Sequence, residues 1–130
     1  MWVFTETGFV SAVVHFDDPE MLMVRARDRK SLEGLEKSGG VKTIDTPDGD
    51  YPHRVVVSKA DFQEWMVDRL EEMEYHNFKS QVAKTRGHKF AAPLHDVWDV
   101  MHEVEEDRSR KTLRSSLYLD YTGFDKDLYA

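Results

Sequence analysis

Short apolar segments separated by turn residues occupy the first 58 positions, and helical spacing of apolar residues follows them. We expect strands over residues 2–6, 9–16, 21–26, 41–45 and 51–57. The link Asp17-Asp18-Pro19-Glu20 has the Asp and Pro typical of a turn, so the strands beside it should form a hairpin. A short helix is expected over residues 28–37, capped by Asp28, with Leu32 and Leu35 facing inward and glycines at its end.

The run from Ser58 to Met73 predicts an amphipathic helix directly after an apolar strand. Ser58 can act as its N-cap, with Asp61 three residues on. Its apolar stripe should consist of Phe62, Trp65, Met66, Leu70 and Met73.

Two further helices are expected before residue 108. Asn77 can cap a helix over residues 78–85, which Gly87 ends. Pro93 should lie near the start of the final helix, where proline is tolerated. The buried stripe of that helix is expected to be Leu94, Val97, Trp98, Met101 and Val104.

This order of elements predicts an α+β fold. A mostly antiparallel sheet of four to five strands (residues 1–58) should pack against the C-terminal helices. A chain of 130 residues fits one domain. Because the pattern breaks at Arg108, we predict a single α+β domain over residues 1–107 and a C-terminal tail over residues 108–130.

Composition narrows the classes of function. The net charge of −7 argues against binding to duplex DNA and to anionic membranes, since both rely on Lys and Arg. The absence of cysteine excludes a disulfide scaffold, a Cys-based zinc site and a thiol nucleophile. There is no basic signal-peptide region, no apolar segment of membrane-spanning length and no phosphate-binding glycine motif. We therefore expect a cytoplasmic protein with no cofactor and no membrane contact.

The C-terminal tail is basic and aromatic. It carries five Lys or Arg and three Asp or Glu, so its net charge is +2, and since the whole chain is −7 the preceding body is −9. Arg and aromatic residues dominate interface energetics, so the tail is expected to bind a protein partner or to be exchanged between two copies in a homodimer. A loose chain end is the alternative. The expected contact residues are Arg108, Arg110, Lys111, Arg114, Leu117, Tyr118, Leu119, Tyr121 and Phe124.

Two groups of polar residues offer candidate chemistry. His95, Asp99, His102 and Glu106 share one ridge of the final helix, a spacing that can hold a divalent metal, but a solvated polar helix face is the simpler explanation. That ridge is expected to point away from the stripe that contains Trp98. A group near a turn, His15 with Asp17 and Asp18, could serve acid–base catalysis, but local turn bonding is the simpler explanation. No catalytic residue is assigned.

Arg25, Arg27 and Arg54 could form an anion- or RNA-contacting surface, because Arg25 and Arg27 share one face of their strand. A solvated sheet face paired with Asp28, Glu33 or Glu36 is the alternative. No aromatic pattern of the RNA-binding type is evident, and the three tryptophans, Trp2, Trp65 and Trp98, are assigned to the core.

Three segments carry a resemblance to a group of small proteins of actinobacteria and their phages: MWVFTETGFVSAVVHFDDPEMLMVRARDRKSLEGL, YPHRVVVSKADFQEWM and YHNFKSQV. The resemblance covers about residues 1–105. It implies a bacterial or phage cytoplasmic setting and transfers no catalytic residue, because no activity is known to us for the group.

The leading hypothesis is therefore a non-enzymatic accessory or regulatory protein that acts through protein–protein contacts. The resemblance allows that it is encoded by a phage. The alternative is an enzyme of unfamiliar type using His15/Asp17 or a His95/Asp99/His102 site. An RNA-contacting module is a third, weaker hypothesis.

Overall fold

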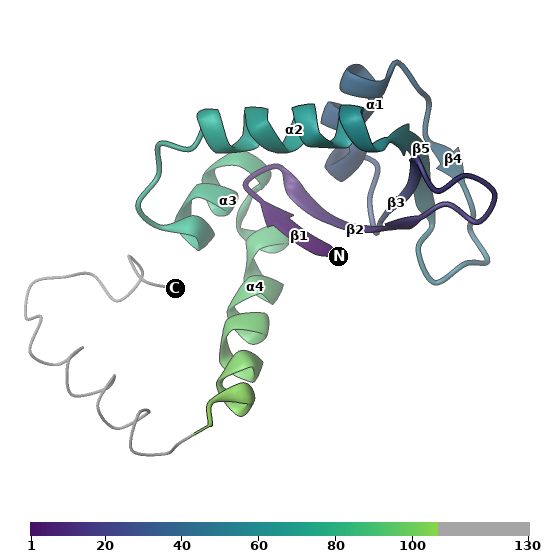
Figure 1. The fold of residues 1–130 in the computed structure, drawn as a ribbon. Helices are drawn as coiled ribbons and strands as arrows, with labels where there is room; N and C mark the ends of the chain where they lie inside the picture. Colours follow the sequence, from purple (N-terminus) through teal and green to yellow (C-terminus); the bar gives the residue numbers. More distant parts are fainter. Residues whose placement is uncertain (107–130) are drawn as a thin grey trace, which may run out of the picture. The chain divides into compact units, whose positions relative to one another are not determined.

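The computed structural model describes residues 1–106, and its contacts divide the chain into two compact units (Figure 1). The first unit is Met1–Glu74 and the second begins at Tyr75. Each unit is described by itself below. The predicted boundary between residues 107 and 108 lies outside the described residues, so the limits of the tail stay a prediction.

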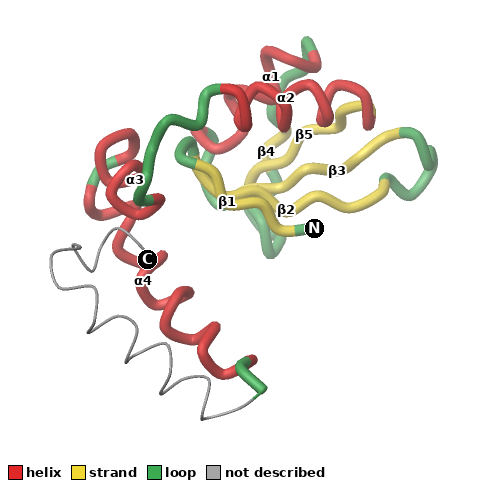
Figure 2. Tube along the Cα trace, turned by 60° about the vertical axis from the view of Figure 1, so that its left-hand side comes forward, coloured by secondary structure: helices red, strands yellow, loops and turns green. Residues whose placement is uncertain are grey.

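The first unit is built on a five-stranded antiparallel sheet (Figure 2). Its strands are β1 (Trp2–Thr5), β2 (Gly8–Val14), β3 (Met21–Ala26), β4 (Ile44–Asp45) and β5 (His53–Ser58). They lie in the order β1-β2-β3-β5-β4. Strands β2 and β3 form the predicted hairpin, in which Ala12 pairs with Val24. The predicted α+β fold, with an antiparallel sheet and C-terminal helices, is confirmed.

Two helices, α1 (Glu33–Gly39) and α2 (Lys59–Glu71), lie over one face of this sheet (Figure 1). Alternate residues of the strands point toward them and form the core. Val24 lies at its centre, between Ala12 on β2 and Val55 on β5. The buried set is Val10, Ala12, Val24, Ala26, Leu32, Leu35, Val55, Val57, Phe62 and Trp65.

Helix α2 begins as predicted. The Ser58 hydroxyl accepts a hydrogen bond from the Asp61 backbone N–H at 3.0 Å, which satisfies one of the free donors of the first turn. Phe62 and Trp65 are buried, and Trp65 is only 3% exposed. The predicted stripe is wrong at its C-terminal end, because Leu70 is 62% exposed and Met73 is also exposed.

The short helical segment before β4 differs from the prediction in its start. It consists of a 3-10 turn, η1 (Lys30–Leu32), which runs into α1. Asp28 is not its N-cap, since Arg29 has that position and Asp28 instead accepts a hydrogen bond from the Ser31 hydroxyl at 2.5 Å. Leu32 and Leu35 are fully buried, as predicted.

The second unit contains α3 (Phe78–Arg86), α4 (His88–Val100) and the 3-10 turn η2 (Met101–Val104). The Asn77 side chain accepts a hydrogen bond from the Ser80 backbone N–H at 2.8 Å, so the predicted cap is confirmed. Gly87 separates the two helices with a φ of 92°, a conformation that favours glycine. Helix α4 begins at His88, so Pro93 lies inside the helix instead of near its start.

The predicted buried stripe of α4 is wrong. Val97, Met101 and Val104 are exposed, and Trp98 is 40% exposed. Within the described part of this unit α4 packs only on α3 and continues into η2, and a helix with one neighbour keeps much of its surface in solvent. Among residues 1–106, no helix is long and apolar enough to cross a lipid bilayer.

Candidate functional site

The sheet face opposite α1 and α2, here called the open face, carries the most distinctive side chains of the first unit. Its residues alternate with the core residues along each strand. They are Trp2 and Phe4 of β1, Phe9, Ser11 and Val13 of β2, Met21, Met23 and Arg25 of β3, Ile44 of β4, and Arg54, Val56 and Ser58 of β5. The register places one row across the whole sheet, Trp2–Ser11–Arg25–Arg54–Ile44. No Lys, Asp or Glu occurs among these strand positions.

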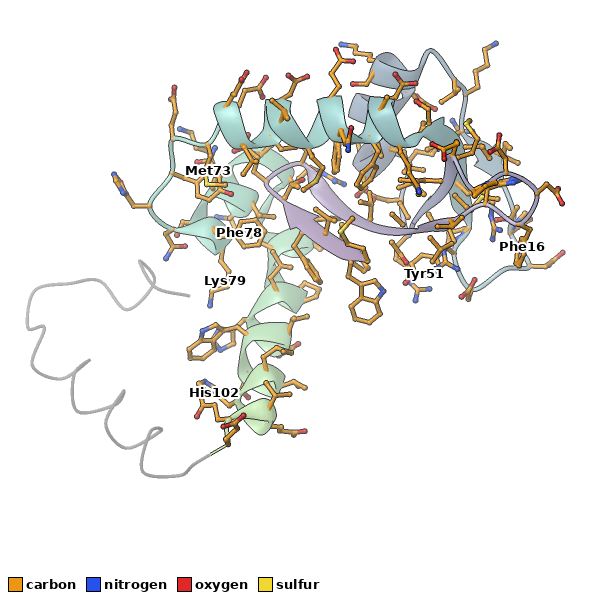
Figure 3. All side chains as sticks on the ribbon, in the orientation of Figure 1. Phe16, Tyr51, Met73, Phe78, Lys79 and His102 are labelled. Carbon is orange, nitrogen blue, oxygen red and sulfur yellow. The ribbon has the colours of Figure 1, made fainter. Side chains whose placement is uncertain are left out.

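Three arginines gather around one tyrosine on this face, and we call Arg25, Arg27, Arg54 and Tyr51 the arginine cluster. The guanidinium carbons of Arg25 and Arg27 lie 4.8 Å and 4.4 Å from the centre of the Tyr51 ring. Tyr51 itself is buried and lies on the side of the sheet away from α2 (Figure 3). A cation over an aromatic face is stabilised by the ring's electron density, so Tyr51 helps to hold two positive charges together.

The arginine cluster uses neutral acceptors only. Arg25 Nη2 donates to the Ser11 hydroxyl at 2.9 Å, and Arg27 donates to the backbone carbonyl of Asp50. Arg54 Nε donates to the Thr46 hydroxyl at 3.0 Å, inside the turn that precedes β5. Within residues 1–106, no carboxylate forms an ion pair with any of these three arginines. The alternative given for these arginines, pairing with Asp28, Glu33 or Glu36, is therefore not found among residues 1–106.

The two other arginines of the same unit, in contrast, form ion pairs with carboxylates. Arg29 pairs with Asp45 at 3.0 Å, and Arg69 pairs with Glu72 at 2.6 Å. Arg29 and the His53 side chain, which bonds Asp45 at 2.8 Å, lower the pKa of the Asp45 carboxyl. Because Asp45 pairs with His53 in the register and His53 alternates with Arg54, this carboxylate belongs to the opposite side of the sheet from the arginine cluster.

The register also places two like charges face to face. Arg25 and Arg54 are directly opposite each other on neighbouring strands, an arrangement that destabilises a sheet when no counter-charge is present. In addition, Arg25 Nε is inaccessible to solvent and has no hydrogen-bond partner in the described structure. Within residues 1–106 the cluster is thus a positive site that no carboxylate neutralises.

An aromatic group lies at the other end of the same face. The Phe4 and Phe9 rings stack with their centres 4.5 Å apart, and Trp2 meets Phe9 edge-on at 5.6 Å. Trp2 is 69% exposed, so its assignment to the core was wrong. Trp2 pairs with Ser11, which pairs with Arg25, so aromatic and cationic side chains share one row of the sheet face.

The proposed metal ridge does not assemble. His95 stacks on Trp98 and its Nδ1 lies 3.0 Å from Lys79 Nζ. The His102 ring also contacts Trp98, and its Nδ1 lies 2.9 Å from Glu105 Oε1. Lys79 and His102 are labelled in Figure 3. The histidines therefore flank Trp98 instead of pointing away from it. Among the described residues, which include Asp99 and Glu106, no group of three or more potential ligands could hold a metal ion.

The polar residues near the first hairpin form turn bonds. The His15 Nδ1 accepts from the Asp17 backbone N–H at 3.2 Å, and Asp18 accepts from the Glu20 backbone N–H at 2.9 Å. This is the simpler of the two explanations weighed for these residues, and it leaves no arranged acid–base pair.

Some of this site could be predicted and some could not. Arg25, Arg27 and Arg54 were candidates from the sequence, whereas Tyr51, Ser11 and the aromatic group were missed. Strict alternation along β2 would have placed Phe9 and Ser11 on the face opposite Val10.

The predicted contact residues of the tail, from Arg108 to Phe124, lie outside the described residues. Comparison of the chain with protein-family models, with curated proteins and with solved structures finds no match.

Proposed function

We propose that this protein is a non-enzymatic accessory or regulatory protein that acts through protein–protein contacts, and that the open face is its contact surface. The observation that carries the proposal is the composition of this face. It combines Trp, Phe, Met and Arg with no Lys, Asp or Glu on its strands. Interface cores have this same enrichment and depletion relative to ordinary protein surface.

Charge complementarity defines the kind of partner. The arginine cluster presents three positive charges without carboxylate partners in the described structure, on the same sheet face as exposed Trp2. A protein partner with an acidic surface patch would neutralise the cluster and cover the indole at once. A cytoplasmic setting in an actinobacterium or its phage remains part of this proposal.

Site-specific crosslinking tests the surface. A photoreactive amino acid is placed at Val13 on the open face or, as a control, at Leu70, which is exposed on α2. We expect a crosslinked protein from host cells at position 13 and none at position 70. The identified partner is then purified and titrated against Trp2→Ala, which should weaken binding about tenfold or more, as truncation of an interface anchor does. Crosslinks at position 70 alone, or unchanged affinity of Trp2→Ala, would contradict the proposal.

Single-stranded RNA is a second candidate for the open face, favoured by one observation. The Trp2, Phe4 and Phe9 rings share this face with the arginines, and sheets that bind RNA combine stacking rings with cationic groups in this way. Fluorescence anisotropy with a labelled oligouridylate distinguishes the two candidates. Submicromolar, salt-dependent binding that Trp2→Ala removes would favour RNA over a protein partner.

A further inference from the structure

The arginine cluster has the charge and the free donors of an anion site. Arginine stays protonated at all physiological pH values, so Arg25, Arg27 and Arg54 carry a fixed charge that burial or pH cannot remove. Their bonded partners within residues 1–106 are hydroxyl and carbonyl oxygens, which leave that charge uncompensated. The two other arginines of this unit are neutralised, Arg29 by the Asp45 carboxylate and Arg69 by the Glu72 carboxylate.

The three arginines play different parts. Arg54 is held within the turn by the Thr46 hydroxyl and, at 3.5 Å, by the Tyr51 carbonyl, so it supplies charge from a fixed position. Arg25 and Arg27 share the Tyr51 ring and are therefore neighbours, and each has N–H groups that bond no atom of residues 1–106. Arg25 is held by Ser11, whereas Arg27 bonds the Asp50 carbonyl and is exposed, so a ligand can reach its guanidinium from solvent.

We infer that the arginine cluster binds a phosphate monoester dianion, in the form of a phosphorylated side chain on the protein partner. A single carboxylate would leave most of the local positive charge unmet, whereas a phosphorylated side chain brings about two negative charges and several strong acceptor oxygens. Guanidinium groups match phosphate oxygens with paired hydrogen bonds, so two neighbouring arginines can hold one phosphate between them. This inference rests on the proposed function, because it names the chemistry of the same face.

The neighbourhood of the cluster fits a phosphate better than a metal or a cation. Asp50 is the acidic residue next to Tyr51, and its carboxylate already accepts the Tyr51 backbone N–H at 3.0 Å. Asp45 is occupied by Arg29 and His53 on the opposite side of the sheet. The exposed Trp2 ring lies along the same row and can contact the residues that flank a phosphorylated side chain.

The probe for the site is phenyl phosphate, with inorganic phosphate as its unsubstituted counterpart. Uniformly ¹⁵N-labelled protein is titrated with each and followed by NMR, with sodium acetate and sodium chloride at matched ionic strength and pH as controls. We expect shifts centred on Arg25, Arg27 and Tyr51, and a dissociation constant for phenyl phosphate at least about tenfold below that for acetate. Equal responses to phenyl phosphate and acetate would overturn the inference.

Matched variants assign the effect to the cluster. Arg27→Gln removes an exposed guanidinium and should weaken phenyl phosphate binding about tenfold, the loss expected for a charged hydrogen bond. Arg25→Gln should do the same, and its folding is checked by the same spectra. Arg69→Gln, which removes an arginine that is paired with Glu72, should leave the affinity unchanged. Equal affinity in Arg27→Gln and wild type would show that the cluster is not the site.

Two further outcomes separate this inference from the proposed function. A crosslink at position 13 together with no preference for phosphate would keep the protein-contact surface and overturn the phosphate site. If an oligouridylate binds more tightly than phenyl phosphate, the ligand is RNA and the inferred phosphorylated side chain is wrong.

Discussion

The contact between α1 and α2 can be tested at a single glycine. Gly34 lies in the first turn of α1, and the Trp65 indole of α2 packs directly against it. A Cβ at position 34 would lie 2.8 Å from Trp65 Nε1 and 3.1 Å from Cδ1. Both distances are shorter than the roughly 3.5–4.0 Å at which nonbonded heavy atoms attract each other. Gly34→Ala therefore forces either the indole or the helix to move.

Two opposing effects set the magnitude. Alanine is a better helix former than glycine, which would stabilise the protein by about 0.5–1 kcal/mol at most. Overpacking a well-filled core costs about 1–3 kcal/mol. Trp65 is buried and its ring centre lies 5.4 Å from that of Phe62, so the indole cannot swing outward freely. We expect the steric effect to prevail and Gly34→Ala to lower the free energy of unfolding by about 1–2 kcal/mol.

Urea denaturation followed by circular dichroism measures this change. The matched background is Trp65→Leu, which is less stable but has a shorter side chain that leaves room for a Cβ at position 34. In that background Gly34→Ala should stabilise the protein, so the two substitutions should be coupled by more than about 1 kcal/mol in a double-mutant cycle. If Gly34→Ala stabilises the wild-type protein, or has the same effect in both backgrounds, then Trp65 does not pack on α1 as described.

Three further outcomes are expected. Ser58→Ala should lower the free energy of unfolding by about 1 kcal/mol, because it removes the N-cap of α2, and an unchanged urea midpoint would show that the cap is dispensable. Thr43 hydrogen bonds lower the pKa of the Glu36 carboxyl below its ordinary value of 4.5, so this stabilisation is complete above pH 4.5 and disappears as the pH falls through the lower pKa of the folded state. Glu36→Gln should accordingly lose less stability on acidification than wild type, and parallel urea midpoints for the two proteins against pH would refute this. The net charge of −7 predicts no salt-sensitive binding to duplex DNA, which a gel-shift titration checks.

Local features of the fold could be predicted from the sequence because they depend on neighbouring residues. The β2–β3 hairpin and the caps at Ser58 and Asn77 are set by turn and capping chemistry within a few positions. The buried face of α4 could not be predicted, because apolar spacing shows that a helix has a stripe but not which neighbours are present to cover it. Pro93 was also misplaced, because α4 begins directly after Gly87 and Pro93 is the sixth residue of the helix, whereas proline is favoured at the first helical position.

The candidate site shows the same division. Alternation along β3 placed Arg25 and Arg27 on one face without any structure. The position of Arg54 opposite Arg25 depends on the register of β3 with β5, which joins strands that are distant in sequence. Tyr51 enters the cluster through the turn that leads into β5, so neither it nor the missing counter-charge could be read from the chain.

The join between β3 and β5 also has a consequence for the order of folding. Strands β1, β2 and β3 pair with their neighbours in sequence, whereas Met21 pairs with Ser58 and Ala26 with His53. Closing that long loop costs chain entropy before the Val24–Val55 contact of the core can form. We therefore expect the join to limit the rate of folding, so that Val55→Ala mainly slows refolding, while substitutions in the edge strand β1, such as Val3→Ala, mainly speed unfolding. Stopped-flow kinetics in which Val55→Ala changes only the unfolding rate would show that the β3–β5 join forms after the transition state.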